Sequence, residues 1–121
     1  QKILGDSTLR VSPTTVRVPV FYSHSESVNV ETFNPISAGE VKELLARMEG
    51  VQVFDNPESN EYPLAIDCAG KDEVFVGRIR DDISCENAIT FWVVSDNLRK
   101  GAALNAVQIA EYLVTRCGAK G

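Results

Sequence analysis

The sequence lacks the features that mark membrane and nucleic-acid-binding proteins. No apolar run approaches the ~20 residues that a membrane-spanning helix requires, and no amphipathic stretch has a lysine-rich polar face. Residues 1–10 lack the apolar segment of a secretory signal peptide. With 12 Lys and Arg against 17 Asp and Glu, the net charge is −5. So acidic a chain has no positive surface for phosphate backbones. We therefore expect neither a membrane nor a nucleic acid as a partner.

Cysteine is scarce as well. Cys68, Cys85 and Cys117 are odd in number and widely spaced, with no Cys-x-x-Cys pair and no Cys/His cluster. This pattern indicates neither a disulfide framework nor a zinc site, so we expect no bound metal. Free cysteines usually behave as small buried hydrophobes, and reduced thiols are typical of cytoplasmic proteins. We expect three structural cysteines in a cytoplasmic protein.

Motifs for nucleotide binding and for serine-type catalysis are missing too. Neither GxGxxG nor GxxxxGKS occurs, and no Ser–His–Asp arrangement can be assigned. The 121 residues contain no repeat or linker, and 44% of them are hydrophobic. That is enough for one domain with its own core, over residues 1–121, but not for two of ordinary size. The opening KIL, stopped by Gly5, is typical of a helix end and suggests part of a longer protein.

The pattern of apolar residues predicts an α+β fold. β-branched and alternating residues predict strands over 14–21, 27–32, 51–54, 63–67, 74–80 and 88–95. A capping box of Ser37 and Glu40 begins a helix that stops at Gly50. The longest helix runs from about 96 to 116, with a stripe typical of a buried face at Leu98, Ala102, Ala106, Ile109 and Leu113. We expect a mainly antiparallel or mixed sheet with helices packed on one face.

Three polar features are candidates for chemistry. His24 is the only histidine and can exchange protons near neutral pH, although its position alone favours an ordinary histidine in a surface loop. Arg17 lies among valines, where its guanidinium would suit a carboxylate or phosphate; a solvent-facing arginine is the alternative. Arg78 and Arg80 share one strand face, which favours solvent or a partner subunit. These residues alone specify no reaction.

A further candidate is the start of the long helix at Asn97. Helix N-termini offer free N–H groups and a positive dipole end, and Gly101 and the alanines after it permit close approach of a ligand. The alternative is an ordinary capped helix whose small residues serve tight packing.

Three stretches together resemble the C-terminal part of aspartate-semialdehyde dehydrogenases. They are residues 17–31 (RVPVFYSHSESVNVE), 74–80 (VFVGRIR) and 92–108 (WVVSDNLRKGAALNAVQ). They are similar, in order, to the family's segment with the substrate-binding arginine and acid/base histidine, to a strand of its dimerisation domain, and to its last strand and C-terminal helix. The resemblance implies the family's α+β catalytic and dimerisation domain, without the N-terminal nucleotide-binding domain.

The resemblance also implies a reaction and roles. The family interconverts L-aspartate 4-semialdehyde, phosphate and NADP with aspartyl 4-phosphate and NADPH, through a cysteine thioester. Carried over, Arg17 would bind the substrate carboxylate, His24 would act as general acid or base, and Asn97 would lie near the nicotinamide carboxamide. NADP would be bound mainly by the absent N-terminal domain. A homodimer is expected, with the sheet that carries Arg78 and Arg80 as its interface region.

The sequence departs from the family in two respects. Ser23 stands where a glycine is common before the histidine, which affects the backbone because only glycine is free at positive φ. None of the three cysteines matches the family's nucleophile, so this chain by itself is expected to be inactive. The family's last helix packs on the N-terminal domain. The face around Leu98, Ala102 and Ile109 is therefore expected to be partly exposed here or covered by a second copy.

Three other functions remain open. One is a non-catalytic paralogue of the same fold, and another is a free-standing dimerisation module. The third is a related acyl-phosphate reductase, such as an N-acetyl-glutamyl-phosphate reductase, although the spacing of Arg17 and His24 and the segment around Asn97 fit it less well.

Overall fold

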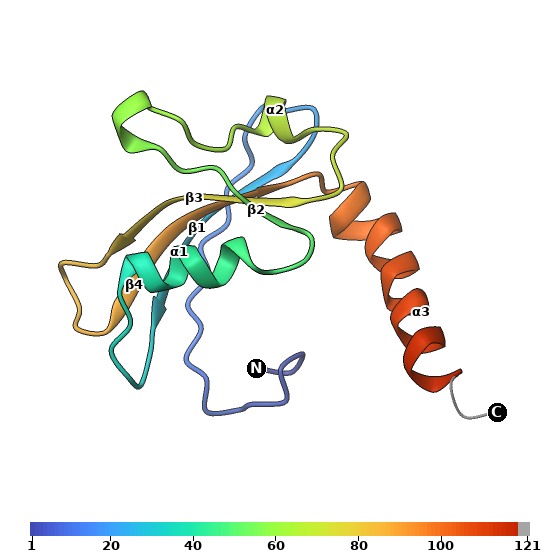
Figure 1. Cartoon of the computed structure of the whole chain (residues 1–121), viewed down its shortest axis with the longest axis horizontal. Coiled ribbons are helices and arrows are strands. Elements are labelled where there is room, and N and C mark those ends of the chain that lie inside the picture. The colour runs from blue at the N-terminus through green and yellow to red at the C-terminus, as the bar shows by residue number, and fades with distance from the viewer. Residues whose placement is uncertain (119–121) are drawn as a thin grey trace.

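A four-stranded mixed sheet forms the body of the molecule in the computed structural model, which describes residues 1–118. Its strands are β1 (His24–Glu31), β2 (Val51–Val53), β3 (Val74–Asp81) and β4 (Ala88–Ser95), in the order β1-β4-β3-β2 (Figure 1). β4 pairs antiparallel with both β1 and β3, whereas β2 runs parallel to β3. The predicted α+β class and mixed sheet are confirmed.

Five helical segments connect or follow the strands. They are α1 (Ala38–Ala46), the 3₁₀ turn η1 (Pro57–Ser59), α2 (Ala65–Cys68), the π-helical turn η2 (Arg99–Ala103) and α3 (Leu104–Cys117). The predicted capping box of α1 is confirmed: Ser37 Oγ accepts from the Glu40 N–H at 3.3 Å, and Glu40 Oε2 accepts from the Ser37 N–H at 2.8 Å. These bonds satisfy backbone donors that a helix start leaves free.

The helices α1 and α2 lie on opposite faces of the sheet rather than together on one (Figure 1). Phe75 and Val94 are register partners, and Cys68 of α2 packs on them to form the buried cluster. Val76 points to the other face, where α1 contacts β2 and β3. The cause is topological. The crossover from β1 to β2 contains α1, and the crossover from β2 to β3 contains α2. Both join parallel strands but run in opposite directions across the sheet, so right-handed connections place their helices on opposite sides.

A bulge in β3 is fixed by a buried carboxylate. Gly77 pairs with Trp92 and Arg80 with Thr90, so an extra residue is inserted between them, and Arg78 adopts φ +53°. The side chain of Asp55, 4% exposed, accepts from the Arg78 N–H at 2.8 Å. Lys42 of α1 donates to the backbone oxygen of Asp55 at 2.6 Å. One aspartate thus joins the bulge to α1.

Two of the predicted strands are wrong. Residues 14–21 form no strand, and Val16 is 81% exposed. Its alternation is that of a strand, but Pro19 removes a backbone donor, and within residues 1–118 no neighbouring strand pairs with it. Residues 63–67 are not a strand either, because Ala65–Cys68 forms α2. This turn belongs to the crossover that two parallel strands require.

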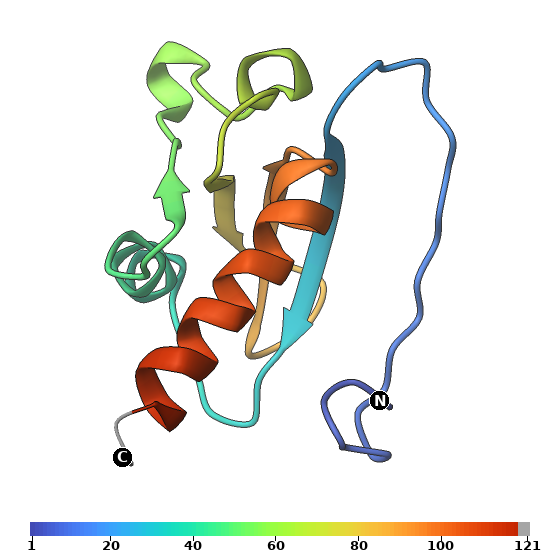
Figure 2. The ribbon, with the colours of Figure 1, turned by 90° about the vertical axis from the view of Figure 1, so that its right-hand side faces the viewer.

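The stripe on the last helix is not buried within the described chain. Leu98, Ile109 and Leu113 are all more than half exposed, because α3 extends from the end of β4 and contacts mainly η2. Figure 2 shows α3 lying across the view as a separate rod in front of the strands. The partial exposure expected from the resemblance is confirmed. No helix among residues 1–118 is both long and apolar enough to cross a bilayer.

Gly77 provides a test of the packing between β3 and the segment after β2. A Cβ at this position would lie 2.3 Å from the Phe54 backbone oxygen and 2.6 Å from Pro63 Cδ. Gly77→Ala should therefore lower the free energy of unfolding by about 1–3 kcal/mol, the usual range for overpacking. Urea denaturation measures this change.

The matched control is Gly39→Ala in α1, where a Cβ would meet only Ser37 Oγ at 3.9 Å. That substitution should raise the free energy of unfolding by about 0.5–1 kcal/mol, because alanine favours the helix. Equal effects of the two alanines would contradict the packing described at Gly77.

Candidate functional site

The candidate site lies where β1 begins and β4 ends. His24 is the first residue of β1 and pairs with Ser95, the last residue of β4. The imidazole is exposed. Alternation along the strands places it on the face that also carries Val76, the face that α1 covers further along. His24 is therefore at a sheet end and open to a ligand, as an acid/base group must be.

Asn97 and Ser23 join across this junction. Asn97 Oδ1 accepts a hydrogen bond from the Ser23 N–H at 2.8 Å, between residues 74 positions apart in the sequence. Ser23 is 3% exposed and adopts φ +76°. This confirms that the residue before His24 needs the left-handed backbone that glycine adopts most easily. Ser23 Oγ is buried, and nothing in residues 1–118 hydrogen-bonds to it.

Asp96 holds the other side of Asn97. Its carboxylate, on a residue only 4% exposed, accepts from the backbone N–H groups of Gly70 at 2.7 Å, Leu98 at 2.8 Å and Arg99 at 3.1 Å. These bonds, the one from Gly70 foremost, hold the pKa of Asp96 below its ordinary value. Arg99 also forms an ion pair with Asp72. The turn carrying Asn97 is thus anchored to the loop before β3.

Arg17 is not brought into contact with His24 or Asn97. It lies on the exposed segment before β1, which Figure 2 shows looping away from the sheet. Within the 118 described residues, its guanidinium makes no hydrogen bond or ion pair. The structure thus joins two of the three predicted site residues and leaves the third as a free cation seven positions before His24.

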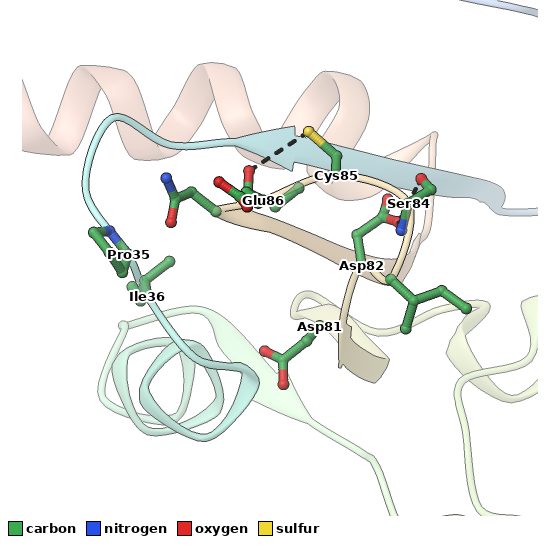
Figure 3. Close-up of a pocket in the computed structure, with 10 residues that line it drawn as sticks. Pro35, Ile36, Asp81, Asp82, Ser84, Cys85 and Glu86 are labelled. Atoms are coloured by element: carbon green, nitrogen blue, oxygen red, sulfur yellow. Dashed lines mark hydrogen bonds between the residues drawn. The ribbon is translucent and has the colours of Figure 1, made fainter.

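Two shallow cavities lie elsewhere. One, of about 380 Å³, is at the β3–β4 hairpin, where Cys85 Sγ lies 3.5 Å from the backbone oxygen of Glu86 (Figure 3). It lies at the opposite end of β1 from His24. The other, of about 390 Å³, lies between Ser25 and Arg78, whose guanidinium is 5.4 Å from the centre of the Tyr62 ring. Ser25 points to the face opposite His24, so neither cavity contains the histidine.

Neither cysteine with a described side chain is activated as a nucleophile. Cys68 is buried in the core cluster, and this burial raises its thiol pKa. Cys85 Sγ donates to Glu31 Oε1 at 3.2 Å, which raises the pKa of Cys85. The expected structural role is confirmed for Cys68, which is buried in the core. Cys85 is half-buried and links the β3–β4 hairpin to Glu31 of β1. The side chain of Cys117 is outside the described residues. Among the side chains described, no cluster of His, Cys, Asp and Glu could hold a metal ion.

Sequence reasoning missed two supporting residues, Asp96 and Asp55. Asp96 was recognised only as part of a helix start, although an aspartate between a strand and a helix is a common N-terminal cap. Its bond to Gly70 depends on the loop before β3 and has no local signal. The same holds for the carboxylate of Asp55 at the bulge.

Comparison with known proteins finds similar sequences for nearly the whole chain. Residues 1–100 match the family model described as semialdehyde dehydrogenase, dimerisation domain. The chain is 57% identical over 114 residues to aspartate-semialdehyde dehydrogenase of Aquifex aeolicus, covering 94% of this chain and 34% of that protein. It is 52% identical to aspartate-semialdehyde dehydrogenase 2 of Vibrio cholerae, covering 94% of this chain and 33% of that protein. The chain therefore spans about a third of the length of the curated relatives it matches.

A solved structure shares the fold. The crystal structure of aspartate semialdehyde dehydrogenase II from Vibrio cholerae, complexed with ASA, superposes with a TM-score of 0.76 and 52% sequence identity. The alignment covers 82% of this chain and 29% of that one.

Ser23 provides a test of backbone strain at the site. Ser23→Gly should raise the free energy of unfolding by about 1 kcal/mol, because it removes both the left-handed penalty of a Cβ and the unpartnered buried hydroxyl. Chemical denaturation measures the gain. Ser23→Ala removes only the hydroxyl and should recover less of it. If alanine stabilised more than glycine, the strain at φ +76° would be refuted.

Asp96 makes stability depend on pH. Because its pKa is lower in the folded protein than in the unfolded chain, where it is about 3.9, its contribution is present above that value. The contribution disappears as the pH falls through the folded pKa. Asp96→Asn should lower the urea midpoint at pH 7, and the gap from the wild type should shrink below about pH 4.

The control for this titration is Glu73→Gln, which removes an exposed carboxylate from the loop before β3. It should leave the midpoint nearly unchanged. A gap between wild type and Asp96→Asn that stays constant from pH 7 to pH 3 would contradict the role of the Asp96 charge.

Proposed function

Because this chain belongs to the family of semialdehyde dehydrogenase dimerisation domains, we propose that it is the C-terminal catalytic and dimerisation part of an aspartate-semialdehyde dehydrogenase. The complete enzyme would interconvert L-aspartate 4-semialdehyde, phosphate and NADP with aspartyl 4-phosphate and NADPH, a step in the biosynthesis of aspartate-family amino acids. The observation that carries the proposal is the junction itself. An exposed histidine starts β1, and the residue before it is held in a left-handed conformation by Asn97.

His24 would act as the acid/base group. In the oxidative direction, a thiol adds to the aldehyde carbon, and the resulting hydroxyl must lose its proton as the carbon loses hydride. A neutral imidazole within hydrogen-bond reach accepts that proton, and imidazolium returns it in the reverse direction. Phosphate then attacks the thioester, forming the acyl phosphate and releasing the thiol. The exposed position of His24 at the strand end supports this role.

Arg17 would bind the α-carboxylate of the substrate. A guanidinium offers paired N–H donors that match the two carboxylate oxygens, and the charge favours the substrate's anionic end. Arg17 is exposed and precedes His24 by seven residues on the same segment. A carboxylate held there would be tethered close in sequence to the acid/base group.

Asn97 would contact the nicotinamide carboxamide of NADP. When bound, NADP would supply the hydride acceptor for oxidation of the thiol adduct. Only one end of the Asn97 side chain is available for such a contact. Its oxygen already accepts from the Ser23 N–H, whereas its half-buried amide NH₂ remains as a donor. The rest of the dinucleotide would be held outside this chain, in agreement with the missing glycine-rich motifs.

The nucleophilic thiol would also come from outside this chain. Cys68 is buried and Cys85 donates to a carboxylate, and both have raised thiol pKa values that disfavour the reactive thiolate. Expressed alone, the chain should therefore bind substrate weakly and show no turnover.

A homodimer in the cytoplasm completes the proposal. The family description as a dimerisation domain supports association of two copies. The sheet region around Arg78 and Arg80 would contribute to the interface, since both side chains are exposed on β3.

The test uses the full-length enzyme that contains this chain and follows phosphate-dependent reduction of NADP by aspartate semialdehyde. His24→Ala should lower kcat by about 10²–10⁴-fold, the range for loss of a general acid or base. Ser27→Ala, on the same strand but the opposite face, is the control and should keep kcat near the wild-type value.

Three outcomes separate the alternatives. No turnover by a folded, dimeric wild-type enzyme would refute the proposed activity and favour a non-catalytic paralogue. Turnover only with another acyl phosphate would favour a related reductase. A normal kcat for His24→Ala would retain the enzyme and remove His24 from the acid/base role.

A further inference from the structure

We infer that Asn97 is a positioning residue for His24, acting through the backbone N–H of Ser23. This inference rests on the proposed function of His24 and assigns to the Asn97 side chain a task separate from any contact with the cofactor. The oxygen atom of the amide carries this task, and the NH₂ group remains for a ligand.

The first step of the argument is the position of the clamp. His24 and Ser95 form the terminal pair of the β1–β4 ladder. The bond from Ser23 N to Asn97 Oδ1 lies just beyond that pair, one residue before His24 and two residues after Ser95. Strand ends are where a ladder opens most easily. A hydrogen bond placed there keeps the backbone of His24 paired with β4.

The second step is the conformation that the clamp maintains. A serine at φ +76° is unfavourable by roughly 1–2 kcal/mol relative to an ordinary conformation. Without its hydrogen bond to Asn97, residue 23 would relax toward negative φ. The angle φ describes rotation about the N–Cα bond of Ser23, and a change in it redirects the chain at His24. The direction of the His24 side chain therefore depends on the Asn97 oxygen.

The third step is that Asn97 is itself held. On one side, the buried carboxylate of Asp96 binds the N–H groups of Gly70 and Leu98. On the other, Arg99 is paired with Asp72. The main chain that carries Asn97 is thus fixed by its neighbours, so the Asn97 side chain extends from an anchored turn toward Ser23. Fixed supporting groups of this kind give a catalytic side chain its orientation.

A double-mutant cycle in the full-length enzyme tests the inference. Asn97→Ala should lower kcat by about 10–100-fold, the order expected from a small misplacement of a reacting group. In a His24→Ala background the same substitution should lower kcat by less than about twofold, because the group that Asn97 positions is gone. A loss of kcat that persists in full in the His24→Ala background would overturn the inference.

The readouts separate this role from the proposed cofactor contact. Loss of a contact to NADP would raise KM for NADP by the same factor with or without His24, whereas mispositioning of His24 lowers kcat and depends on His24. If His24→Ala alone leaves kcat unchanged, the proposed function of His24 fails, and with it the positioning role. If His24→Ala lowers kcat but Asn97→Ala adds an independent loss, only the positioning role fails.

Asn29→Ala is the matched control. Asn29 also links the two strands, donating from Nδ2 to Thr90 Oγ1 at 3.0 Å, but it lies five residues from His24. It should lower stability with little change in kcat. An equal loss of kcat in both variants would mean that any loosening of the ladder disturbs His24, and would overturn a specific role for Asn97.

Asn97→Asp tests the same point if Asn97→Ala does not fold. The aspartate keeps an oxygen for the Ser23 N–H and removes the amide donors. A kcat within about threefold of the wild type at neutral pH, or a larger loss that vanishes in the His24→Ala background, supports positioning. A loss that remains in that background overturns it.

Discussion

The buried carboxylate of Asp96 is the interaction on which the rest of the site depends. It lies directly after β4, the strand that pairs with both β1 and β3, where the chain must leave the sheet. A charge buried without partners would be strongly unfavourable. Here three backbone N–H groups, from Gly70, Leu98 and Arg99, surround it. The same bonds begin the last helix and fix the loop before β3, so that Asn97 has one defined position.

Two strained residues in this structure are stabilised in the same way. Ser23 and Arg78 have left-handed backbones without being glycine or asparagine. The Ser23 N–H donates to the side-chain oxygen of Asn97, and the Arg78 N–H donates to a side-chain oxygen of Asp55, each at 2.8 Å. Strain of this kind persists only where the surroundings determine the conformation. One of these pairs shapes the bulge of β3, and the other shapes the approach to His24.

The parts of the fold that could be predicted from the sequence are those that depend on residues close together in the chain. The capping box at Ser37 and the alternation in β4 are local, and both predictions are confirmed. The alternation in 14–21 is equally regular, but a strand needs a hydrogen-bonded neighbour. The residues of the segment alone do not show whether such a neighbour is present. The stripe on α3 correctly indicates an apolar face, but within residues 1–118 most of that face stays exposed.

At the site, too, local features could be predicted from the sequence and contacts between distant residues could not. His24 and the helix start at Asn97 stand out in the sequence itself, and the resemblance implies their roles. The serine in place of a glycine before His24 correctly indicates a special backbone. The hydrogen bond that joins Asn97 to Ser23, the neighbour of His24, spans 74 residues, so no local pattern contains it. The substrate-binding role of Arg17 stays a prediction: the proposed ligand is the substrate, so no side chain of residues 1–118 is expected to pair with it.

The hydrogen bond between Ser23 and Asn97 restricts the residue type at position 97 more than at position 23. Position 23 is buried and contributes only its backbone N–H to the bond, so a small residue able to adopt φ +76° can occupy it, with glycine the least strained. Position 97 contributes a side-chain oxygen at a fixed reach, which only asparagine or aspartate provides without moving the main chain. An exchange of serine and glycine at 23 therefore keeps the hydrogen bond, while a change at 97 removes it unless another group in the junction replaces the oxygen.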